Sequence, residues 1–304
     1  MNSAHPSGGS ILVTGATGLT GSAIVREFIR AGHPVRVLVR NPTRAAALRA
    51  FPTVEVVEGD LLRPQTLRGA LEGVDRAFLL SSPDTHLVEA QTSFIDAAKS
   101  SDVEHIVKLS GLSAADIGTP FIFGAMHAEI ESYLQDSGLS WTHLRPSQFM
   151  TEYLRELRTI LAQGALFLPF QDARLVPVDI IDIARVAFLL LTTSGHKGKT
   201  YALSGPEALN MHQIAQKIGE ATGRTIRYVE VQREDRNAAL RAAGVPEFFV
   251  RALDAQTGER LLGRESVIHL ETHEALGLNP TTFSEFAARN VGAFLGETTY
   301  VGLT

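Results

Sequence analysis

The stretch ILVTGATGLTGSAIV, residues 11–25, places three glycines within seven positions between two apolar segments. Residues 11–14 have the composition of a buried strand. The apolar residues that follow repeat at the spacing of one helix face: Leu19, Ile24, Val25 and Phe28. The stretch therefore predicts a strand, a glycine-rich turn and a helix, in that order.

Each glycine in this turn meets a different physical requirement. Gly15 permits a tight turn after the strand, Gly18 leaves space for a phosphate, and Gly21 lets the helix pack closely. The helix N-terminus offers free N–H groups and a partial positive charge to an anion. We therefore predict a dinucleotide pyrophosphate site, although an ordinary strand-to-helix turn is the alternative because the spacing is GxxGxxG and not GxGxxG. The predicted contacts are Gly15, Thr17, Gly18, Leu19, Thr20 and Gly21.

Composition limits the class of protein. The 304 residues are 44% hydrophobic and 20% charged, which is typical of a soluble globular chain with one large or two modest domains. The net charge of −5 comes without a basic cluster, so no nucleic-acid partner is expected. The chain has no cysteine, which excludes disulfides and thiol catalysis and is compatible with a cytoplasmic protein.

Neither a targeting segment nor a membrane span is expected. The opening MNSAHPSGGS lacks the basic and apolar regions of a signal peptide and predicts a loose tail. The most apolar later stretch, VPVDIIDIARVAFLLLTT, contains Asp179, Asp182 and Arg185, so it predicts a buried helix. We therefore expect no membrane partner.

Apolar, β-rich runs recur along the chain with helical patterns between them. Such alternation predicts an α/β fold, with a Rossmann-type doubly wound parallel sheet and a smaller, mostly helical C-terminal cap domain. The predicted cofactor domain comprises residues 10–148 and 175–204, and the predicted cap comprises 149–174 and 205–298. The expected strands lie at 11–14, 34–39, 53–57, 76–80, 105–110 and 141–145, and further strand-like runs lie at 173–178 and 200–205.

The second strand indicates which dinucleotide is bound. A site that prefers NAD usually has Asp or Glu about 20 residues after the glycines, where it binds the ribose 2′-hydroxyl. Here the strand ends in VLVRNPTR, with Arg40 and Arg44 and no acid nearby. Arg40 is suited to a charge-assisted pair with a 2′-phosphate, which favours NADP(H); a solvated loop arginine is the alternative.

Several motifs together resemble the NmrA-like group of atypical short-chain dehydrogenases/reductases. They are VTGATGLTG, VRNP, VEGDL, HIVKLSGLSA, HAEIESYLQDSGLSWTHLRPSQFM and VPVDIIDIARVA, and the resemblance covers about residues 10–300. It implies a Rossmann-type fold and NADP(H) binding. Some members of the group reduce quinones, dyes or other conjugated acceptors, while others are regulators that sense the cofactor without chemistry.

The resemblance also implies roles for individual residues. Asp60 and Leu61 would border the adenine, and the run Leu80, Ser81 and Ser82 would line the path of the adenosine and pyrophosphate. Ser110 would lie beside the nicotinamide, and the segment from Pro146 to Phe149 would close over it. As alternatives, Asp60 caps the helix near Pro64, and the two serines are ordinary turn residues.

The catalytic positions of the wider superfamily are altered in this chain. Typical short-chain dehydrogenases use Tyr and Lys four residues apart, whereas FGAMH has Phe123 and His127 at these positions, and Gly111 stands at the usual Ser position. Because Phe cannot donate a proton, a conventional alcohol dehydrogenase mechanism is not expected.

His127 is the candidate catalytic residue and a candidate cofactor contact. An imidazole with a reference pKa of about 6.5 can hydrogen-bond a ribose hydroxyl or a substrate carbonyl and donate a proton near neutral pH. An ordinary helix histidine, or an ion pair with Glu131 one turn later, is the alternative. No metal site is expected, because further ligands are missing.

Aromatic and Met residues near the expected cleft indicate an apolar slot for a flat conjugated molecule, or else the core of the cap. The predicted substrate contacts are Phe123, Met150, Tyr153, Phe170 and Phe248. The predicted function is an NADPH-dependent reductase that transfers hydride to an apolar conjugated acceptor such as a quinone. The alternative is an NADP(H)-sensing regulatory protein without turnover, and a homodimer is compatible with either.

Overall fold

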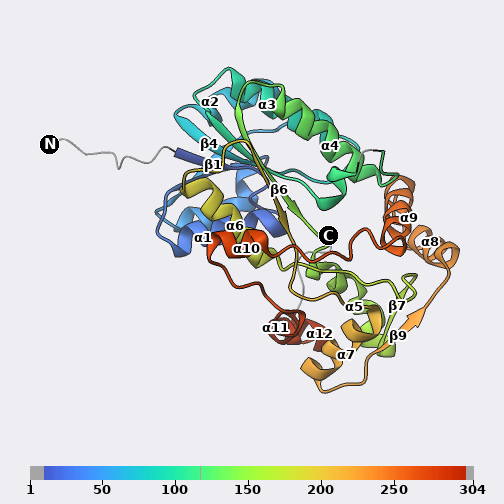
Figure 1. Cartoon of the computed structure of the whole chain (residues 1–304). Helices are drawn as coiled ribbons and strands as arrows, with labels where there is room; N and C mark the ends of the chain where they lie inside the picture. The colour runs from blue at the N-terminus through green and yellow to red at the C-terminus, as the bar shows by residue number, and fades with distance from the viewer. Residues whose placement is uncertain (1–9, 117, 299–304) are drawn as a thin grey trace. The chain divides into compact units, whose positions relative to one another are not determined.

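The large sheet of the protein has seven strands in the order β3-β2-β1-β4-β5-β6-β8, as a computed structural model shows for residues 10–116 and 118–298 (Figure 1). The predicted N-terminal tail lies almost entirely outside the described residues. Neighbouring strands from β3 to β5 are parallel, so their carboxyl ends meet at one edge of the sheet. The strands are β1 (Ser10–Val13), β2 (Val35–Val39), β3 (Val54–Glu58), β4 (Val74–Leu79), β5 (His105–Leu109), β6 (Ser140–Pro146) and β8 (Lys199–Leu203).

Helices connect these strands, and α2 and α3 lie on the opposite face of the sheet from α1 (Figure 1). The α-helices up to residue 192 are α1 (Leu19–Arg30), α2 (Leu67–Leu71), α3 (Leu87–Lys99), α4 (Ile122–Gln135), α5 (Leu157–Gln163) and α6 (Ile180–Thr192). Short 3-10 helices are η1 (Pro42–Ala50), η2 (Pro64–Thr66), η3 (Leu112–Ala115) and η4 (Met150–Glu156).

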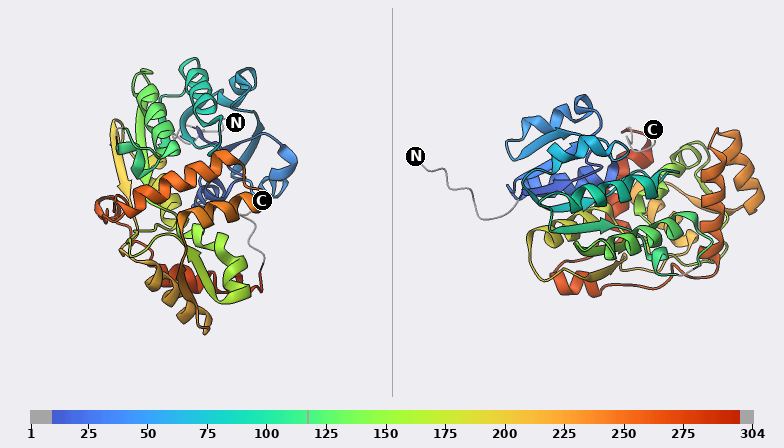
Figure 2. Two further views of the ribbon diagram at one scale, coloured as in Figure 1. Left: turned by 90° about the vertical axis from the view of Figure 1, so that its right-hand side faces the viewer. Right: turned by 90° about the horizontal axis from the view of Figure 1, so that it is seen from above.

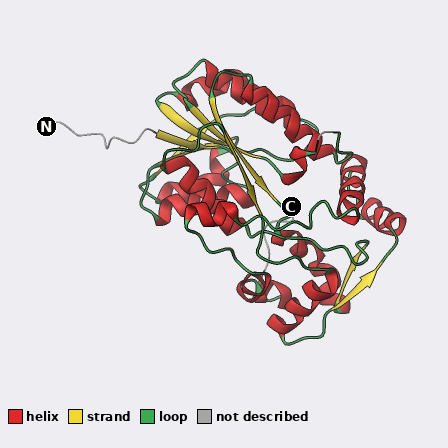
Figure 3. Ribbon diagram, viewed as in Figure 1, coloured by secondary structure: helices red, strands yellow, loops and turns green. Residues whose placement is uncertain are grey.

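The later part of the chain is mostly helical, as predicted. Its helices are α7 (Met211–Thr222), α8 (Arg233–Ala242), α9 (Glu247–Leu261), α10 (Glu271–Leu276), α11 (Phe283–Arg289) and α12 (Val291–Leu295). Helices α8 and α9 pack side by side as a hairpin, held by a forked pair between Arg233 and Asp254 (Figure 2). A second sheet has two parallel strands, β7 (Ala165–Leu168) and β9 (Arg227–Glu230) (Figure 3).

The chain separates into two compact units. The first contains the described residues up to Leu109, together with Glu129–His143 and Ala187–Thr200. The second contains Ser110–Ala128, Leu144–Val186 and the described residues from Tyr201 onward. The predicted boundaries of the cofactor and cap domains stay a prediction.

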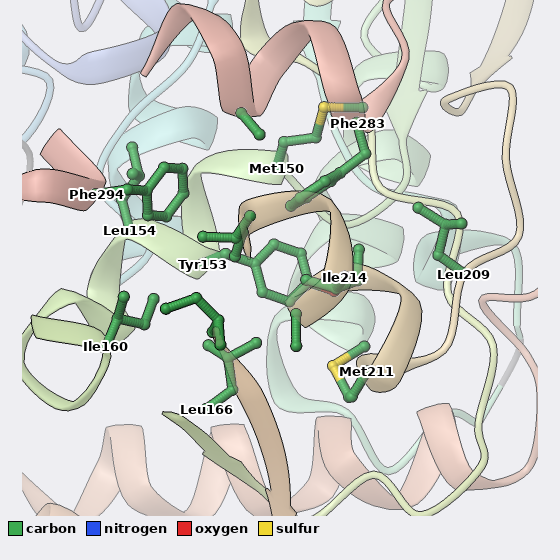
Figure 4. Close-up of a cluster of buried hydrophobic side chains, with 14 of the residues drawn as sticks. Met150, Tyr153, Leu154, Ile160, Leu166, Leu209, Met211, Ile214, Phe283 and Phe294 are labelled. Atoms are coloured by element: carbon green, nitrogen blue, oxygen red, sulfur yellow. The ribbon is translucent and has the colours of Figure 1, made fainter. Parts of the chain in front are cut away.

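Each unit has its own apolar core. In the first unit the ring of Phe28 from α1 packs edge-to-face on Phe188, with 5.0 Å between ring centroids. In the second unit a buried cluster joins η4, α5, β7, α7, α11 and α12, and Tyr153 contacts Phe283 in it at 5.3 Å (Figure 4). Burial of large apolar side chains of this kind contributes about 1.5–3 kcal/mol each.

Two strand predictions need correction. Residues 173–178 form only isolated bridges, Leu175 with Leu209 and Val178 with Phe149, because Pro177 lacks the N–H that a continuing ladder requires. Strands β7 and β9 lie outside the predicted strands, because each has only four residues and, unlike the equally short β1, is not followed by a glycine-rich turn. Among the helices that the structure describes, none is long and apolar enough to cross a membrane.

Candidate functional site

The glycine turn after β1 is as tight as its sequence predicts. Gly15 has a φ of +61°, a left-handed conformation that favours glycine, and a Cβ there would lie 2.8 Å from Leu80 Cγ. A Cβ on Gly21 would lie 2.1 Å from the carbonyl oxygen of Gly15. Gly18 is different, because its backbone is extended and a Cβ added there would meet only the carbonyl oxygen of Gly15, at 3.3 Å. Gly15 and Gly21 are therefore required by the fold, and Gly18 is not.

The N-terminus of α1 is suited to an anion. Gly18 is the N-cap and makes no side-chain capping bond, and the first turn contains no acidic residue. The amide of Ser22 donates to the carbonyl of Gly18 at 2.9 Å, so the amides that precede it in the helix lack helical acceptors. Thr17 and Gly18 are exposed. These groups present the partial positive charge that a phosphate needs.

The end of β4 forms the second wall of this turn. Thr14 Oγ1 accepts from the Leu80 amide at 2.8 Å and donates to the Leu80 carbonyl at 2.6 Å. Ser81 Oγ accepts from Gln91 Nε2 at 3.2 Å, and Ser82 is exposed. The structure therefore brings the predicted residues Leu80, Ser81 and Ser82 together with the glycine turn. The sequence analysis missed Thr14, although a polar residue at the end of a buried strand was a visible signal.

Arg40 and Asp60 follow β2 and β3, the next two strands of the same sheet. Arg40 is exposed and forms no ion pair with any residue in the described ranges, so its guanidinium is available to a phosphate. Asp60 Oδ1 accepts from the Leu62 amide at 3.1 Å and does not cap η2, whose N-cap Arg63 makes no side-chain capping bond. Leu61 is half-buried beside it.

The second unit contains the residues predicted to lie near the nicotinamide. Ser110 directly follows β5 and is 6% exposed, and its Oγ has no hydrogen-bond partner among the described residues. Pro146 ends β6 and is buried, and Phe149 is half-buried and bridges to Val178. A buried hydroxyl without a partner is costly unless a ligand satisfies it, so Ser110 fits the expected cofactor contact.

Phe123 and His127 lie one turn apart on α4, and both are half-buried. The ring of Phe123 contacts Phe121 edge-to-face at 5.9 Å and Phe248 at 5.6 Å. Phe249 lies 6.2 Å from it. Phe121 is buried, whereas Phe123, Phe248 and Phe249 are half-buried and offer the apolar surface that a flat molecule needs. His127 supplies a polar group on the same helix as Phe123.

Three other predicted substrate contacts belong to the core. Met150, Tyr153 and Phe170 are at most 5% exposed and lie in the apolar cluster of the second unit (Figure 4). Burial raises the pKa of the Tyr153 phenol, so it is neutral at physiological pH. Their packing matches the alternative of a cap core, and their contact with a substrate stays a prediction. Within the described residues no cluster of three or more His, Asp or Glu residues is arranged to hold a metal ion.

Comparison with known proteins identifies the family. The model of the NmrA-like family matches residues 7–287. The chain belongs to the NmrA-like family. This confirms the predicted resemblance and the predicted fold class.

Relatives of this NmrA-like chain include named reductases. It is 33% identical over 288 residues to an NAD(P)H azoreductase of Xenophilus azovorans, covering 93% of this chain and 99% of the relative. Its structure is similar to that of an NADPH-dependent quinone oxidoreductase from Escherichia coli complexed with NADPH, at a TM-score of 0.84 and 28% identity, covering 92% and 99%. A triphenylmethane reductase of Citrobacter complexed with NADP(H) gives a TM-score of 0.81 at 25% identity, covering 93% and 99%.

Gly18 and Gly21 of the turn should respond differently to substitution. Gly18→Val should fold with a circular dichroism spectrum and melting temperature near wild type, because its backbone is extended, yet lose measurable NADPH binding by calorimetry. Gly21→Ala should instead lower the melting temperature, because its Cβ collides with the Gly15 carbonyl. Normal NADPH affinity in folded Gly18→Val would show that the turn does not hold the pyrophosphate.

Proposed function

We propose that this NmrA-like chain is an NADPH-dependent reductase that transfers a hydride to an apolar conjugated acceptor such as a quinone. The observation that carries the proposal is the intact dinucleotide turn, in which Gly15 and Gly21 are sterically required and the α1 N-terminus is uncapped. Similarity to an NADPH-bound quinone oxidoreductase and to an azoreductase supports the same class of reaction.

NADP(H) supplies the transferred hydride when it is bound. Gly18 and the first amides of α1 hold the pyrophosphate, and Leu80, Ser81 and Ser82 line the path beside it. Arg40 pairs with the 2′-phosphate, and Asp60 and Leu61 border the adenine. Ser110 Oγ, which is buried without a partner among the described residues, gains one from the nicotinamide end of the cofactor.

The residues of the second unit receive the acceptor. Under this proposal residues 10–148 and 175–204 bind the cofactor, and residues 149–174 and 205–298 cap the substrate. Phe123 and Phe248 offer partly exposed ring surface to a flat molecule, and Met150, Tyr153 and Phe170 pack in the apolar core of the cap. Exclusion of water by these apolar groups strengthens the polar interactions at the reacting atoms.

The proton comes from His127 or from solvent in this proposal, because Phe123 replaces the usual acid. A conjugated acceptor stabilises the anion that forms after hydride arrival, so a strong dedicated acid matters less. The imidazole N–H of His127 hydrogen-bonds the acceptor oxygen, and that oxygen takes its proton from His127 or from solvent. Cytoplasmic localisation and a homodimer stay predictions of the proposal.

Cofactor choice is tested at Arg40. A charge-assisted contact contributes about 1.5–3 kcal/mol, so Arg40→Ala should weaken NADPH binding roughly 10- to 150-fold and NADH binding far less. Arg49→Ala is the matched control, because Arg49 is also exposed and lies near the far end of η1, the 3-10 helix that follows Arg40. Calorimetry with both cofactors measures the difference. Equal losses of affinity for NADPH and NADH would show that Arg40 does not bind the 2′-phosphate.

Turnover separates an enzyme from a cofactor sensor. The purified protein should oxidise NADPH in the presence of quinones, conjugated enones or cationic dyes, as followed by NADPH absorbance. His127→Ala should slow this about 10- to 1000-fold, whereas the exposed His212→Ala serves as a control in the same unit. Tight NADPH binding without NADPH oxidation by any of these acceptors contradicts the reductase and favours the sensor. A sensor needs no proton donor at position 123. Unchanged turnover in His127→Ala would show that His127 has no part in the reaction and would leave the reductase proposal itself intact.

A further inference from the structure

A buried arginine connects α9 to the segment that follows β6. Arg260 is 4% exposed, and its Nε donates to Glu265 Oε2 at 2.9 Å while its Nη2 donates to Glu152 Oε2 at 3.1 Å. The guanidinium carbon lies 5.3 Å from the centre of the Phe170 ring. One guanidinium therefore holds two carboxylates that are 113 positions apart in the chain (265 − 152).

The contacts of this arginine continue into a closed ring. Gln148 Nε2 donates to the same Glu152 oxygen at 3.2 Å. On the other side, the carbonyl of Glu265 accepts from the Val176 amide at 3.2 Å, and the Val176 carbonyl accepts from Ser147 Oγ. The ring thus begins and ends on the adjacent residues Ser147 and Gln148, so both ends of it hold the same short segment.

Stability alone is a weak explanation for this network. Burial by itself lowers the pKa of Arg260, but the carboxylates of Glu265 and Glu152 outweigh it and hold the pKa above its ordinary value. Arg260 and Glu265 are buried, while Glu152 is partly exposed. Taking buried charges out of water costs free energy that their attraction only partly returns, and apolar replacements of such networks are often no less stable. A network that adds little stability over apolar packing still restricts the segment to one geometry.

The segment held by this network follows a strand of the large sheet at the edge where such folds bind ligands. Residues 147–153, called here the β6 segment, follow the carboxyl end of a strand in the large sheet, where open α/β folds bind their ligands. Its 3-10 helix η4 has no side-chain cap. Backbone bonds hold its main chain at three places: the Ser147 amide donates to the Leu203 carbonyl at 2.8 Å, the Gln148 carbonyl accepts from the Val178 amide at 2.8 Å, and the Met150 amide donates to the Val178 carbonyl at 2.9 Å. The ring through Arg260 adds bonds to the side chains of Ser147, Gln148 and Glu152.

We propose that Arg260 is a positioning residue that acts through Glu152 to hold the β6 segment in the conformation that recognises the acceptor. This inference rests on the proposed reductase function, because the acceptor is the ligand whose recognition is at stake. Arg260 takes no part in hydride or proton transfer. Its effect reaches the reaction through the placement of the Gln148 side chain, since small misplacements of groups near a reacting centre can cost about 10²-fold in rate.

The chain contains a matched control for this network. Arg236 of α8 forms a forked pair with Glu156, a buried residue at the end of the same η4 helix, with one bond at 3.2 Å. This pair joins the same helical hairpin to the same 3-10 helix, but among the described residues no hydrogen bond connects it to Ser147 or Gln148. Removing it perturbs η4 without releasing the ring.

The experiment compares two charge-free variants. The first is the triple variant Glu152→Leu/Arg260→Met/Glu265→Leu, and the control is Arg236→Met/Glu156→Leu. The measurements are the kcat and KM for a quinone, the Kd for NADPH by calorimetry, the melting temperature, and hydrogen exchange of peptides covering residues 147–156. The triple variant should lose about 10- to 100-fold in quinone kcat/KM, mainly through KM. It should also exchange faster in the β6 segment, with a melting temperature close to wild type. The control should match wild type in KM and in exchange at residues 147–150.

A folded triple variant with a wild-type KM for the quinone and wild-type hydrogen exchange in the β6 segment overturns the inference. If the triple variant does not fold, Arg260→Lys keeps the charge but loses the forked geometry, and it should show the same two changes to a smaller degree. A folded Arg260→Lys with unchanged KM and exchange overturns the inference as well. Absence of quinone turnover in the wild type contradicts the reductase instead, and the exchange measurement then decides separately whether the network holds the segment.

Discussion

The carbonyl of Gly15 and the backbone of Gly21 approach so closely that a single methyl group at Gly21 would lie 2.1 Å from the carbonyl oxygen. This approach brings α1 directly after β1 and leaves its first amides unpaired at the carboxyl edge of the sheet. The same edge carries Arg40 after β2, Asp60 after β3 and Leu80 after β4. The composition of the site therefore follows from strand order once the turn is closed.

Binding and turnover make different demands on this chain. The cofactor turn uses backbone groups, so it tolerates sequence change wherever the glycines are kept. Under the proposed function, chemistry depends on side chains of the second unit, where Phe123 stands at the expected position of a proton donor and His127 lies one turn away. Such a change would favour acceptors that stabilise charge themselves, and two of the relatives are named as an azoreductase and a quinone oxidoreductase.

Local signals predicted the parts of the structure that are local in sequence. The turn at residues 15–21, the parallel strands and the family resemblance all follow from short runs, and the structure and the comparisons confirm the fold class. The two short strands β7 and β9 were missed because four residues contain too little periodicity and, unlike the equally short β1, neither is followed by a glycine-rich turn. The bond between Arg260 and Glu152 spans 108 positions, so no spacing rule indicates it. Composition also cannot distinguish an aromatic in the core, such as Tyr153, from one on a substrate surface.

The most direct measurement of the central claim is the isotope effect on NADPH oxidation by a quinone in a single turnover. NADPH is prepared with deuterium at either of the two C4 positions of the nicotinamide. A site that orients the ring between fixed groups should transfer from one face only, so one deuterated form should react more slowly than NADPH and the other at the same rate. Equal rates for all three forms under conditions where chemistry limits turnover, or no oxidation at all, would contradict hydride transfer by this protein.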